Sequence, residues 1–431
     1  MAGERVRVTA GRQHEGILLQ SPDEGLILLK LDSGYNVGIN KKGAKITVLK
    51  QATKKTEMKV KKVVAKDLPK ITILHTGGTI ASKVDYETGA VISAFTPQEI
   101  LERFPEIEEI ASIESKLLRN MWSGDMRFAH YNVMAKAIVQ EMKKNVKGII
   151  ITHGTDTMGY SAAALSFMVE GLTVPVILVG AQRSSDRGGT DAAVNLACAA
   201  HFITKTDFTG VALCMHENMN DDACVILPAC KTRKLHSSRR DAFAAVNAQP
   251  IARVTKEGAV AWIEKPVYEE KKVKLTLMDE KIKVGIVRFH PNFFAEELEH
   301  YKNFDGLVIE GTGLGNGPVD VIDKETKEHD KILKTIATMA KKMPVVMTTQ
   351  CVFGRIDMDV YAYGRKLQAA GVIGNGTDML TETAFVKLAW LLSNYPGAVK
   401  ELYLKNLRGE ISERTLIQSE PSRLSHLGDK G

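Results

Sequence analysis

Two short segments of this chain carry side chains that together suit a reaction through a covalent intermediate. Residues 76–81 (TGGTIA) contain Thr79, and residues 153–158 (HGTDTM) contain Thr155 followed by Asp156. A threonine hydroxyl is a weak nucleophile unless a nearby base removes its proton. Glycines beside each threonine allow backbone amides to approach a substrate closely. Two hydroxyls and one carboxylate in such surroundings indicate acyl transfer.

Each segment follows an apolar run that predicts a buried strand. Residues 71–75 read ITILH, and residues 148–152 read GIIIT. Nearly continuous apolar runs are typical of parallel sheets, and ligand sites in open α/β sheets lie at the carboxyl ends of such strands. An ordinary strand-to-helix turn would explain either segment alone. The occurrence of both favours a site at two neighbouring strand ends.

Both segments are similar to the two signature segments of the bacterial-type L-asparaginase/glutaminase family. The similarity extends from Lys70 to Arg408. Weaker matches lie in five further stretches, which are 180–183 (GAQR), 232–236 (TRKLH), 241–244 (DAFA), 349–351 (TQC) and 371–379 (GVIGNGTDM). The resemblance implies an asparaginase-like body that hydrolyses a side-chain amide through a threonine acyl-enzyme.

The resemblance also implies roles for individual side chains. Thr79 is the expected nucleophile, and Tyr86 occupies the place of a mobile lid tyrosine beside that hydroxyl. Thr155, Asp156 and Lys234 form a second group, in which a lysine buried beside a threonine accepts a proton. Asp156 would hold that lysine and also pair with the α-ammonium group of the substrate. Spacing does not decide which threonine attacks first, so Thr155 remains the alternative nucleophile.

Four further residues are expected to bind the substrate. Residues 122–126 (WSGDM) resemble the family segment that binds the substrate α-carboxylate, which assigns Ser123 and Asp125 to this role. The glycine between them departs from the pattern of some family members. Backbone amides of the turns that contain Gly78 and Gly154 would stabilise the tetrahedral oxyanion.

The first 50 residues follow a different pattern from the rest of the chain. Short apolar runs alternate with Asp/Gly turns, as in residues 25–31 (GLILLKL) followed by residues 32–34 (DSG). Several short strands with such turns predict a small barrel of SH3-like or Sm-like type. Small barrels bind RNA or protein in some chains and are inert appendages in others.

A lysine-rich stretch follows this module. Residues 50–70 contain eight lysines against Glu57 and Asp67 only. Such a run is typical of a solvated linker. The alternative is a strip that contacts phosphates, because clustered lysines release counterions when they meet a nucleic acid. No aromatic residue lies among these lysines, so a contact with tRNA here would be electrostatic and nonspecific.

A small β-rich module joined to an asparaginase-like body resembles the D-subunit family of archaeal glutamyl-tRNA(Gln) amidotransferases. The resemblance implies a glutaminase that hydrolyses glutamine and supplies ammonia to an E-type partner, which converts Glu-tRNA(Gln) to Gln-tRNA(Gln). It implies no cofactor or metal in this chain, with ATP and Mg only in the partner and tRNA bound mainly through it. Asparaginase-like sites are commonly completed across a subunit interface, so a homodimeric core within a heterotetramer is expected, with residues 311–317 (GTGLGNG) as the loop that reaches the neighbouring site.

Two other functions are compatible with parts of the sequence. A free-standing L-asparaginase would give the N-terminal module and the lysine-rich stretch no evident purpose. A noncatalytic scaffold on an asparaginase fold would not need an intact set of Thr79, Thr155, Asp156 and Lys234.

Strands and helices alternate from Lys70 onward, which predicts a doubly wound α/β body of two lobes behind the small barrel. The expected divisions are 1–50 (barrel), 51–69 (linker), 70–256 (lobe with the active site), 257–283 (β-rich connector) and 284–431 (smaller α/β lobe and tail). Helices are expected over 98–104, 128–144, 157–170, 191–203 and 382–393, with Asp191 as an N-cap.

Composition agrees with a cytoplasmic enzyme and excludes other classes. No apolar run approaches the length of a membrane span, and no signal-peptide pattern follows Met1. The five cysteines are odd in number and irregularly spaced, which favours reduced thiols. The absence of a G-x-x-x-x-G-K-[ST] loop indicates that the chain does not hydrolyse ATP alone. G-x-S-x-G and H-E-x-x-H motifs are also absent.

Overall fold

The structure is a computed structural model that describes residues 4–19, 21, 23–31, 36–50, 68–84, 91–93, 99, 104–184, 190–266 and 271–415. Tyr86 and most of the lysine-rich stretch therefore lie outside the described residues. So does most of the helix predicted over residues 98–104, of which only Glu99 and Phe104 are described. No helix in the described ranges is both long and apolar enough to span a membrane.

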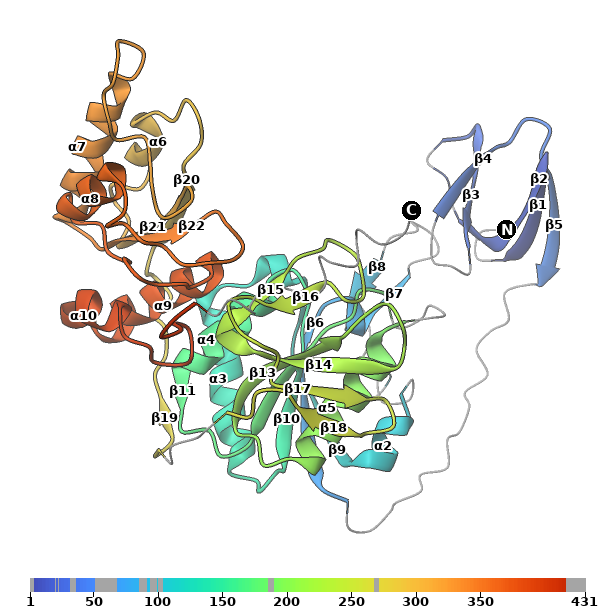
Figure 1. The fold of residues 1–431 in the computed structure, drawn as a ribbon. Helices are drawn as coiled ribbons and strands as arrows, with labels where there is room; N and C mark the ends of the chain where they lie inside the picture. Colours follow the sequence, from blue (N-terminus) through green and yellow to red (C-terminus); the bar gives the residue numbers. More distant parts are fainter. Residues whose placement is uncertain are drawn as a thin grey trace.

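The N-terminal module is a five-stranded antiparallel sheet with the order β4-β3-β2-β1-β5 (Figure 1). Its strands are β1 (Arg5–Ala10), β2 (Arg12–Leu19), β3 (Leu26–Lys30), β4 (Asn36–Asn40) and β5 (Lys45–Lys50). Alternate side chains such as Val6 and Val8 on β1 point into a small core with Leu29. The period-two pattern of the sequence therefore predicted a small β module correctly.

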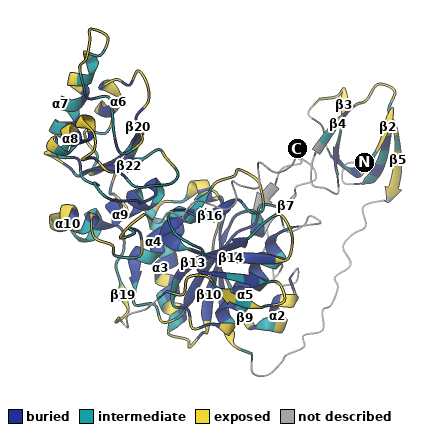
Figure 2. Cartoon of the chain, in the orientation of Figure 1, coloured by how far each residue is buried: buried dark blue, intermediate teal, exposed yellow. Residues whose placement is uncertain are grey.

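The body is built on an eight-stranded mixed sheet with the order β18-β17-β14-β13-β12-β10-β6-β9. The strands are β6 (Lys70–Gly77), β9 (Ser112–Met121), β10 (Gly148–Thr152), β12 (Pro175–Val179), β13 (Gly210–His216), β14 (Ala223–Pro228), β17 (Ala252–Thr255) and β18 (Val260–Trp262). Strands β9, β6, β10, β12 and β13 are parallel to one another. Strands β14, β17 and β18 extend the sheet from β13 in antiparallel pairs. The apolar runs seen in the sequence lie in β6, which is buried after Lys70, and in β10, which is fully buried (Figure 2 shows β10).

Helices cover both faces of this sheet. Helices α3 (Phe128–Met142) and α4 (Met158–Met168) pack in one apolar core, and α2 (Glu106–Ile110) and α5 (Ala192–Lys205) pack in another. The helix predicted over residues 157–170 is too long. Its last two residues form β11 (Val169–Glu170), which pairs with β19 (Lys274–Leu275). The antiparallel pairing of Val169 with Leu275 ends the helix at Met168.

The parallel part of the sheet has a topological switch point beside β6. In chain order, the strands run β6, β9, β10, β12 and β13, and their spatial order is therefore 2-1-3-4-5. The chain moves outward to β9 and then returns to β10 on the other side of β6. In open α/β sheets, ligands bind in the crevice outside the carboxyl ends of the strands at such a point. Both threonine segments start at these ends.

The second lobe has its own core around a three-stranded parallel sheet of β20 (Val284–Arg288), β21 (Gly306–Gly311) and β22 (Val345–Thr349). Its helices are α6 (Glu296–Glu299), α7 (Glu328–Ala340), α8 (Ala362–Ala369), α9 (Thr381–Asn394) and α10 (Val399–Tyr403). Helix α9 lies between the two lobes (Figure 1), and its Trp390 packs on Phe167 of α4 with ring centroids 5.5 Å apart.

Shorter elements complete the body. These are β7 (Ser82–Val84), β8 (Val91–Ser93), β15 (Thr232–Lys234), β16 (Phe243–Ala245) and the 3-10 turns η1 (Thr79–Ala81), η2 (Ser123–Asp125), η3 (Ala229–Lys231) and η4 (Pro396–Ala398). Strands β15 and β16 pair antiparallel, and Lys234 is the last residue of β15. This pairing fixes the backbone from which the Lys234 side chain extends.

Candidate active site

Three loops meet at the carboxyl ends of β6, β9 and β10. Gly77 and Gly78 have φ angles of +104° and +79°, which favour glycine. A Cβ atom on Gly78 would lie 2.4 Å from Gly154 Cα, and a Cβ atom on Gly154 would lie 2.8 Å from Ser123 Oγ. The backbones therefore touch where only glycine fits. Three segments that the sequence proposed as one site are thus in direct contact.

Thr79 and Thr155 lie on the loops that follow β6 and β10, respectively. Thr79 is partly buried and begins η1, directly after Gly78. Thr155 is buried, and a Cβ atom on Gly180 would lie 2.7 Å from its Cγ2. The methyl group of Thr155 is therefore packed against the loop after β12. The hydroxyl group of Thr155 is the part of this side chain that contacts Lys234.

Lys234 reaches this hydroxyl from the β15–β16 hairpin. Its Nζ atom donates to Thr155 Oγ1 at 2.9 Å and to Asp156 Oδ1 at 2.8 Å. The Lys234 side chain is 15% exposed, whereas that of Asp156 is 77% exposed. The ammonium group thus lies at the base of the site beside the buried hydroxyl. The carboxylate faces solvent, where a cationic group of a substrate can reach it.

The remaining predicted site residues have different positions. Ser123 is buried in η2, and its carbonyl oxygen accepts a hydrogen bond from Thr157 Oγ1 at 2.7 Å. Asp125 ends the same turn but is exposed. Tyr86 lies outside the described residues, so its role as a lid residue stays a prediction. No group of three or more His, Cys, Asp and Glu side chains within the described ranges is arranged to hold a metal ion.

Comparisons with known proteins assign the family. The family models "Asparaginase, N-terminal", "Glutaminase/Asparaginase C-terminal domain" and "GatD N-terminal domain" match residues 70–268, 283–401 and 1–49, respectively. The D-type subunit of the glutamyl-tRNA(Gln) amidotransferase of Archaeoglobus fulgidus is 44% identical over 422 residues, which cover 96% of each chain. The chain belongs to the D-subunit family of these amidotransferases. The Pyrococcus furiosus member of the D-subunit family is 43% identical, with 94% of this chain and 92% of the relative covered.

Solved asparaginases share the body of this D-subunit family member. The thermostable L-asparaginase from Thermococcus kodakarensis has a TM-score of 0.72 at 30% sequence identity, and L-asparaginase I from Vibrio cholerae has a TM-score of 0.69 at 27%. Each match covers all of the solved chain and 80% of this chain. The expected asparaginase-like α/β fold is therefore confirmed.

A buried histidine precedes the reactive part of each segment, and sequence reasoning gave neither of them a role. His75 shares hydrogen bonds with Thr152 Oγ1 at 2.8 Å and Ser115 Oγ at 2.7 Å. His153 contacts the Gly154 carbonyl oxygen at 2.7 Å and Ser161 Oγ at 2.8 Å. Burial lowers the pKa of each imidazole to about 4. Both rings are therefore neutral at pH 7 and hold the two strand ends through hydrogen bonds.

These two histidines predict a loss of stability in acid. In the unfolded chain their pKa values return to about 6.5, so the unfolded state binds more protons than the folded state between pH 6.5 and pH 4. Each shift corresponds to about 3 kcal/mol, and the free energy of unfolding should fall by up to that amount per histidine as the pH is lowered through this window. Urea denaturation at several pH values measures this slope. A free energy of unfolding that is constant from pH 6.5 to pH 4.5 would contradict the prediction.

A second support joins the Lys234 strand to the other lobe. Lys231, three residues before Lys234, pairs with Asp378 Oδ1 at 2.8 Å, and both side chains are buried. Arg233 pairs with Glu382 at 3.1 Å, at the start of α9. In the same region, Thr383 Oγ1 donates to the Cys230 carbonyl oxygen at 2.8 Å. The backbone that carries the catalytic-site lysine is thus fixed by the second lobe, through residues nearly 150 positions away.

Proposed function

We propose that this chain is the glutaminase component of a tRNA-dependent amidotransferase, in which glutamine hydrolysis supplies ammonia to a partner subunit. The observation that carries the proposal is the hydrogen bond from Lys234 Nζ to Thr155 Oγ1, at the place where the Gly78–Thr79 turn meets Gly154. Two threonine hydroxyls and an amine at the switch point of the sheet suit attack on an amide. The names of the relatives favour a component of an amidotransferase over a free-standing asparaginase.

The reaction would proceed in two steps that conserve all atoms. In the first step, the hydroxyl oxygen of Thr79 attacks the side-chain amide carbon of glutamine, and a nearby base takes up the hydroxyl proton. The C–N bond then breaks, and this proton passes to the nitrogen, which leaves as ammonia. The product is an ester between the threonine and the glutamyl group. In the second step, water attacks the ester, which releases glutamate and restores the hydroxyl group.

The surrounding groups would bind the substrate and move protons. Lys234 can exchange a proton with Thr155 across their 2.9 Å hydrogen bond. The exposed carboxylate of Asp156 would pair with the α-ammonium group of glutamine, while Ser123 would bind the α-carboxylate. Backbone amides near Gly78 and Gly154 would stabilise the oxyanion. Thr155 is the alternative nucleophile, because its hydroxyl is the one that contacts the amine.

The partner follows from the need to consume ammonia. An E-type subunit would bind most of the tRNA, together with ATP and Mg, and would transfer the ammonia to Glu-tRNA(Gln). A glutaminase in such a complex should remain slow alone, since glutamine would otherwise be hydrolysed without product. A lid around Tyr86 that closes only in the complex would provide this control.

Ammonia release tests the proposal. The assay uses glutamine or asparagine with the full chain alone, with the E-type partner, and with that partner plus Glu-tRNA(Gln). We expect slow turnover of glutamine by the chain alone and a strong increase when partner and charged tRNA are both present. Rapid turnover of asparagine by the isolated chain, unchanged by either addition, would instead identify a free-standing asparaginase.

We also expect a homodimeric core, which is the commonest symmetric assembly. The loop after β21 supports this expectation, because residues 312–316 form a tight turn at a strand end, with Thr312 and Gly313 exposed. Thr312 and Asn316 exchange backbone hydrogen bonds of 2.9 Å, and Thr349 Oγ1 donates to the Gly313 carbonyl oxygen at 2.6 Å. Such a fixed turn can complete the site of a neighbouring copy. Analytical ultracentrifugation at the assay concentration measures the state, and a fully active monomer would contradict the prediction.

A further inference from the structure

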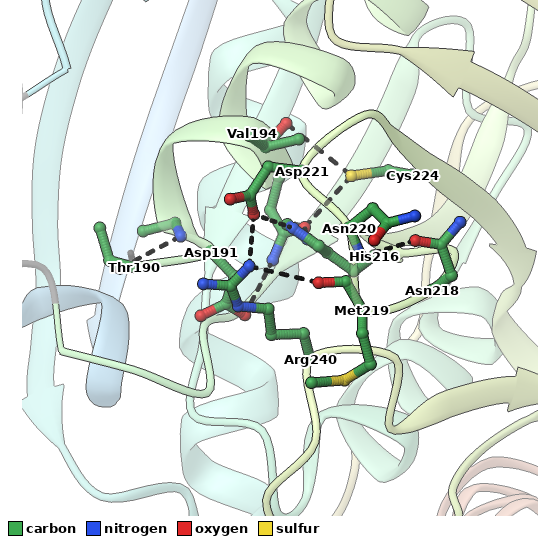
Figure 3. A network of polar contacts seen from close by, with 12 residues as sticks. Thr190, Asp191, Val194, His216, Asn218, Met219, Asn220, Asp221, Cys224 and Arg240 are labelled. Atoms are coloured by element: carbon green, nitrogen blue, oxygen red, sulfur yellow. Dashed lines mark hydrogen bonds and ion pairs between the residues drawn. The ribbon is translucent and has the colours of Figure 1, made fainter. Parts of the chain in front are cut away.

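Polar side chains that include Asp191, His216, Asp221 and Arg240 form one network of contacts (Figure 3). Asp191 accepts hydrogen bonds from the backbone nitrogens of Gln182, at 2.9 and 3.0 Å, and Arg183, at 3.0 Å. Asp191 occupies the N-cap position of α5, as the sequence predicted, but its side chain makes no capping hydrogen bond. The Asp191 carboxylate instead accepts hydrogen bonds from backbone amides of the loop after β12, at Gln182 and Arg183.

Asn195, one turn into α5, extends this support to Thr155. Its Nδ2 atom donates to the Gly180 carbonyl oxygen at 3.0 Å and approaches Asp191 Oδ2 at 3.4 Å. Gly180 is the residue that packs against the methyl group of Thr155. The position of Thr155 therefore depends on the orientation of the Asn195 amide.

His216, at the end of β13, fixes that orientation. Its side chain is fully buried, and its Nδ1 atom lies 2.6 Å from Asn195 Oδ1. The amide nitrogen of Asn195 faces two acceptors, so its oxygen must be the atom that faces the imidazole. Cys224 Sγ donates to the same oxygen at 3.2 Å, which agrees with this assignment. His216 Nδ1 therefore carries a proton and donates it.

The other nitrogen of His216 also faces an oxygen. His216 Nε2 lies 3.2 Å from Asp221 Oδ1, and Arg240 Nη1 lies 2.6 Å from the same oxygen. Partial burial raises the pKa of Asp221, but the hydrogen bond from His216 and the charge of Arg240 outweigh it and lower the pKa overall. Asp221 is therefore an ionised acceptor without a proton. His216 Nε2 must donate as well.

We propose that His216 is a buried imidazolium that positions Thr155 for reaction through Asn195 and the Gly180–Arg183 loop. A neutral ring would turn a lone pair toward one of two oxygen atoms and release either the Asn195 amide or Asp221. Arg240 lies on the loop that follows Lys234. Its contact with Asp221 therefore joins the Lys234 loop to the network that reaches Thr155.

The protonation state is tested by nitrogen NMR of the full-length protein labelled with 15N-histidine. The signals of His216 are identified by their absence from a His216→Gln variant. At pH 8, where an unperturbed histidine is neutral, we expect both ring nitrogens of His216 to show the signature of protonated nitrogen. A signal from one bare ring nitrogen would overturn the proposal. This measurement does not depend on enzyme activity.

The positioning role rests on the proposed glutaminase function and is tested by kinetics. Small displacements of a reacting group cost about tenfold to hundredfold in rate, so His216→Gln should lower kcat for glutamine by that amount, with KM within about twofold. Asp221→Asn is the second variant, with the same expected direction, and decides the outcome if His216→Gln does not fold. An unchanged kcat in a folded variant would overturn the role.

Arg253→Gln is the matched control. Arg253 on β17 pairs with Glu217, the neighbour of His216, at 2.8 Å, but it contacts neither Asn195 nor Asp191 in any described bond. Its removal should loosen the loop between β13 and β14, which carries Glu217 and Asp221, without a change in kcat. An equal loss of kcat in Arg253→Gln would show that general loosening explains the effect and would overturn the proposal. If the wild-type complex releases no ammonia, the proposed function fails, while the NMR measurement still decides the charge of His216.

Discussion

Replacement of Lys234 by alanine should lower the rate of glutamine hydrolysis by about 10²–10⁴-fold, because the loss of one acid/base group typically costs that much. Lys234 Nζ is placed to donate to both Thr155 and Asp156, so its removal leaves the buried hydroxyl without this partner. Ammonia release by the complex with partner and charged tRNA measures the effect. Circular dichroism of the same sample establishes that the variant is folded.

Lys265→Ala provides the control for a lost lysine. Lys265 pairs with Asp207 at 3.0 Å, and both side chains are well exposed. Its loss should leave turnover unchanged. Near-normal turnover of folded Lys234→Ala would exclude the amine from the mechanism.

The two threonines can be separated by the same assay. Thr155→Val keeps the methyl contact with Gly180 and removes only the hydroxyl group, whereas Thr79→Ala removes the expected nucleophile. Both should lose most activity, as should Asp156→Asn. Rapid quenching followed by peptide mass spectrometry then identifies the acylated residue. Glutamyl ester on Thr79 supports the proposed order of attack, and ester on Thr155 supports the alternative.

The parts of the fold that depend on local pattern were predictable from the sequence. Strand β10 has the bounds predicted for it, because an unbroken run of β-branched residues is buried on both faces of the sheet. The contact between Gly78 and Gly154 was also implied, since parallel neighbours place their carboxyl ends together. Helix α4 was overextended, because the tertiary pairing of Val169 with Leu275 leaves no local signal.

The supports of the site were not predictable, because they join residues that are far apart in the chain. Asp191 has the residue type and place of a helix cap, and only the return of the loop after β12 gives its carboxylate other partners. His216 and Asn195 are separated by a strand and a helix end, and no periodicity relates them. The basic stretch around Lys234 has the composition of a solvated face, which concealed the burial of Lys231. Its partner Asp378 lies in the other lobe.

The buried pair of Lys231 and Asp378 should contribute strongly to the stability of the protein. Burial lowers the pKa of Lys231 despite the attraction of Asp378, so the ammonium group relies on this carboxylate. Asp378→Asn would leave the cation buried without a counter-charge, which costs about 3–5 kcal/mol. The Ser412 backbone nitrogen, which donates to Asp378 Oδ1 at 3.0 Å, would lose an ionised acceptor as well. Urea denaturation should show a midpoint well below that of the wild type.

Two further variants distinguish the cause of this loss. Lys231→Met combined with Asp378→Leu removes both charges, and replacement of a buried pair by apolar side chains of similar volume is often neutral or stabilising. We therefore expect the double variant to regain much of the stability that Asp378→Asn loses.

Asp330→Asn breaks an exposed pair with Lys334 on α7 and should leave the midpoint unchanged, because surface pairs contribute little. Equal midpoints for Asp378→Asn and Asp330→Asn would show that the buried pair does not hold the two lobes together. A stable double variant with slow turnover would instead show that the pair positions Lys234, because the strand that carries this lysine would then be folded but misplaced.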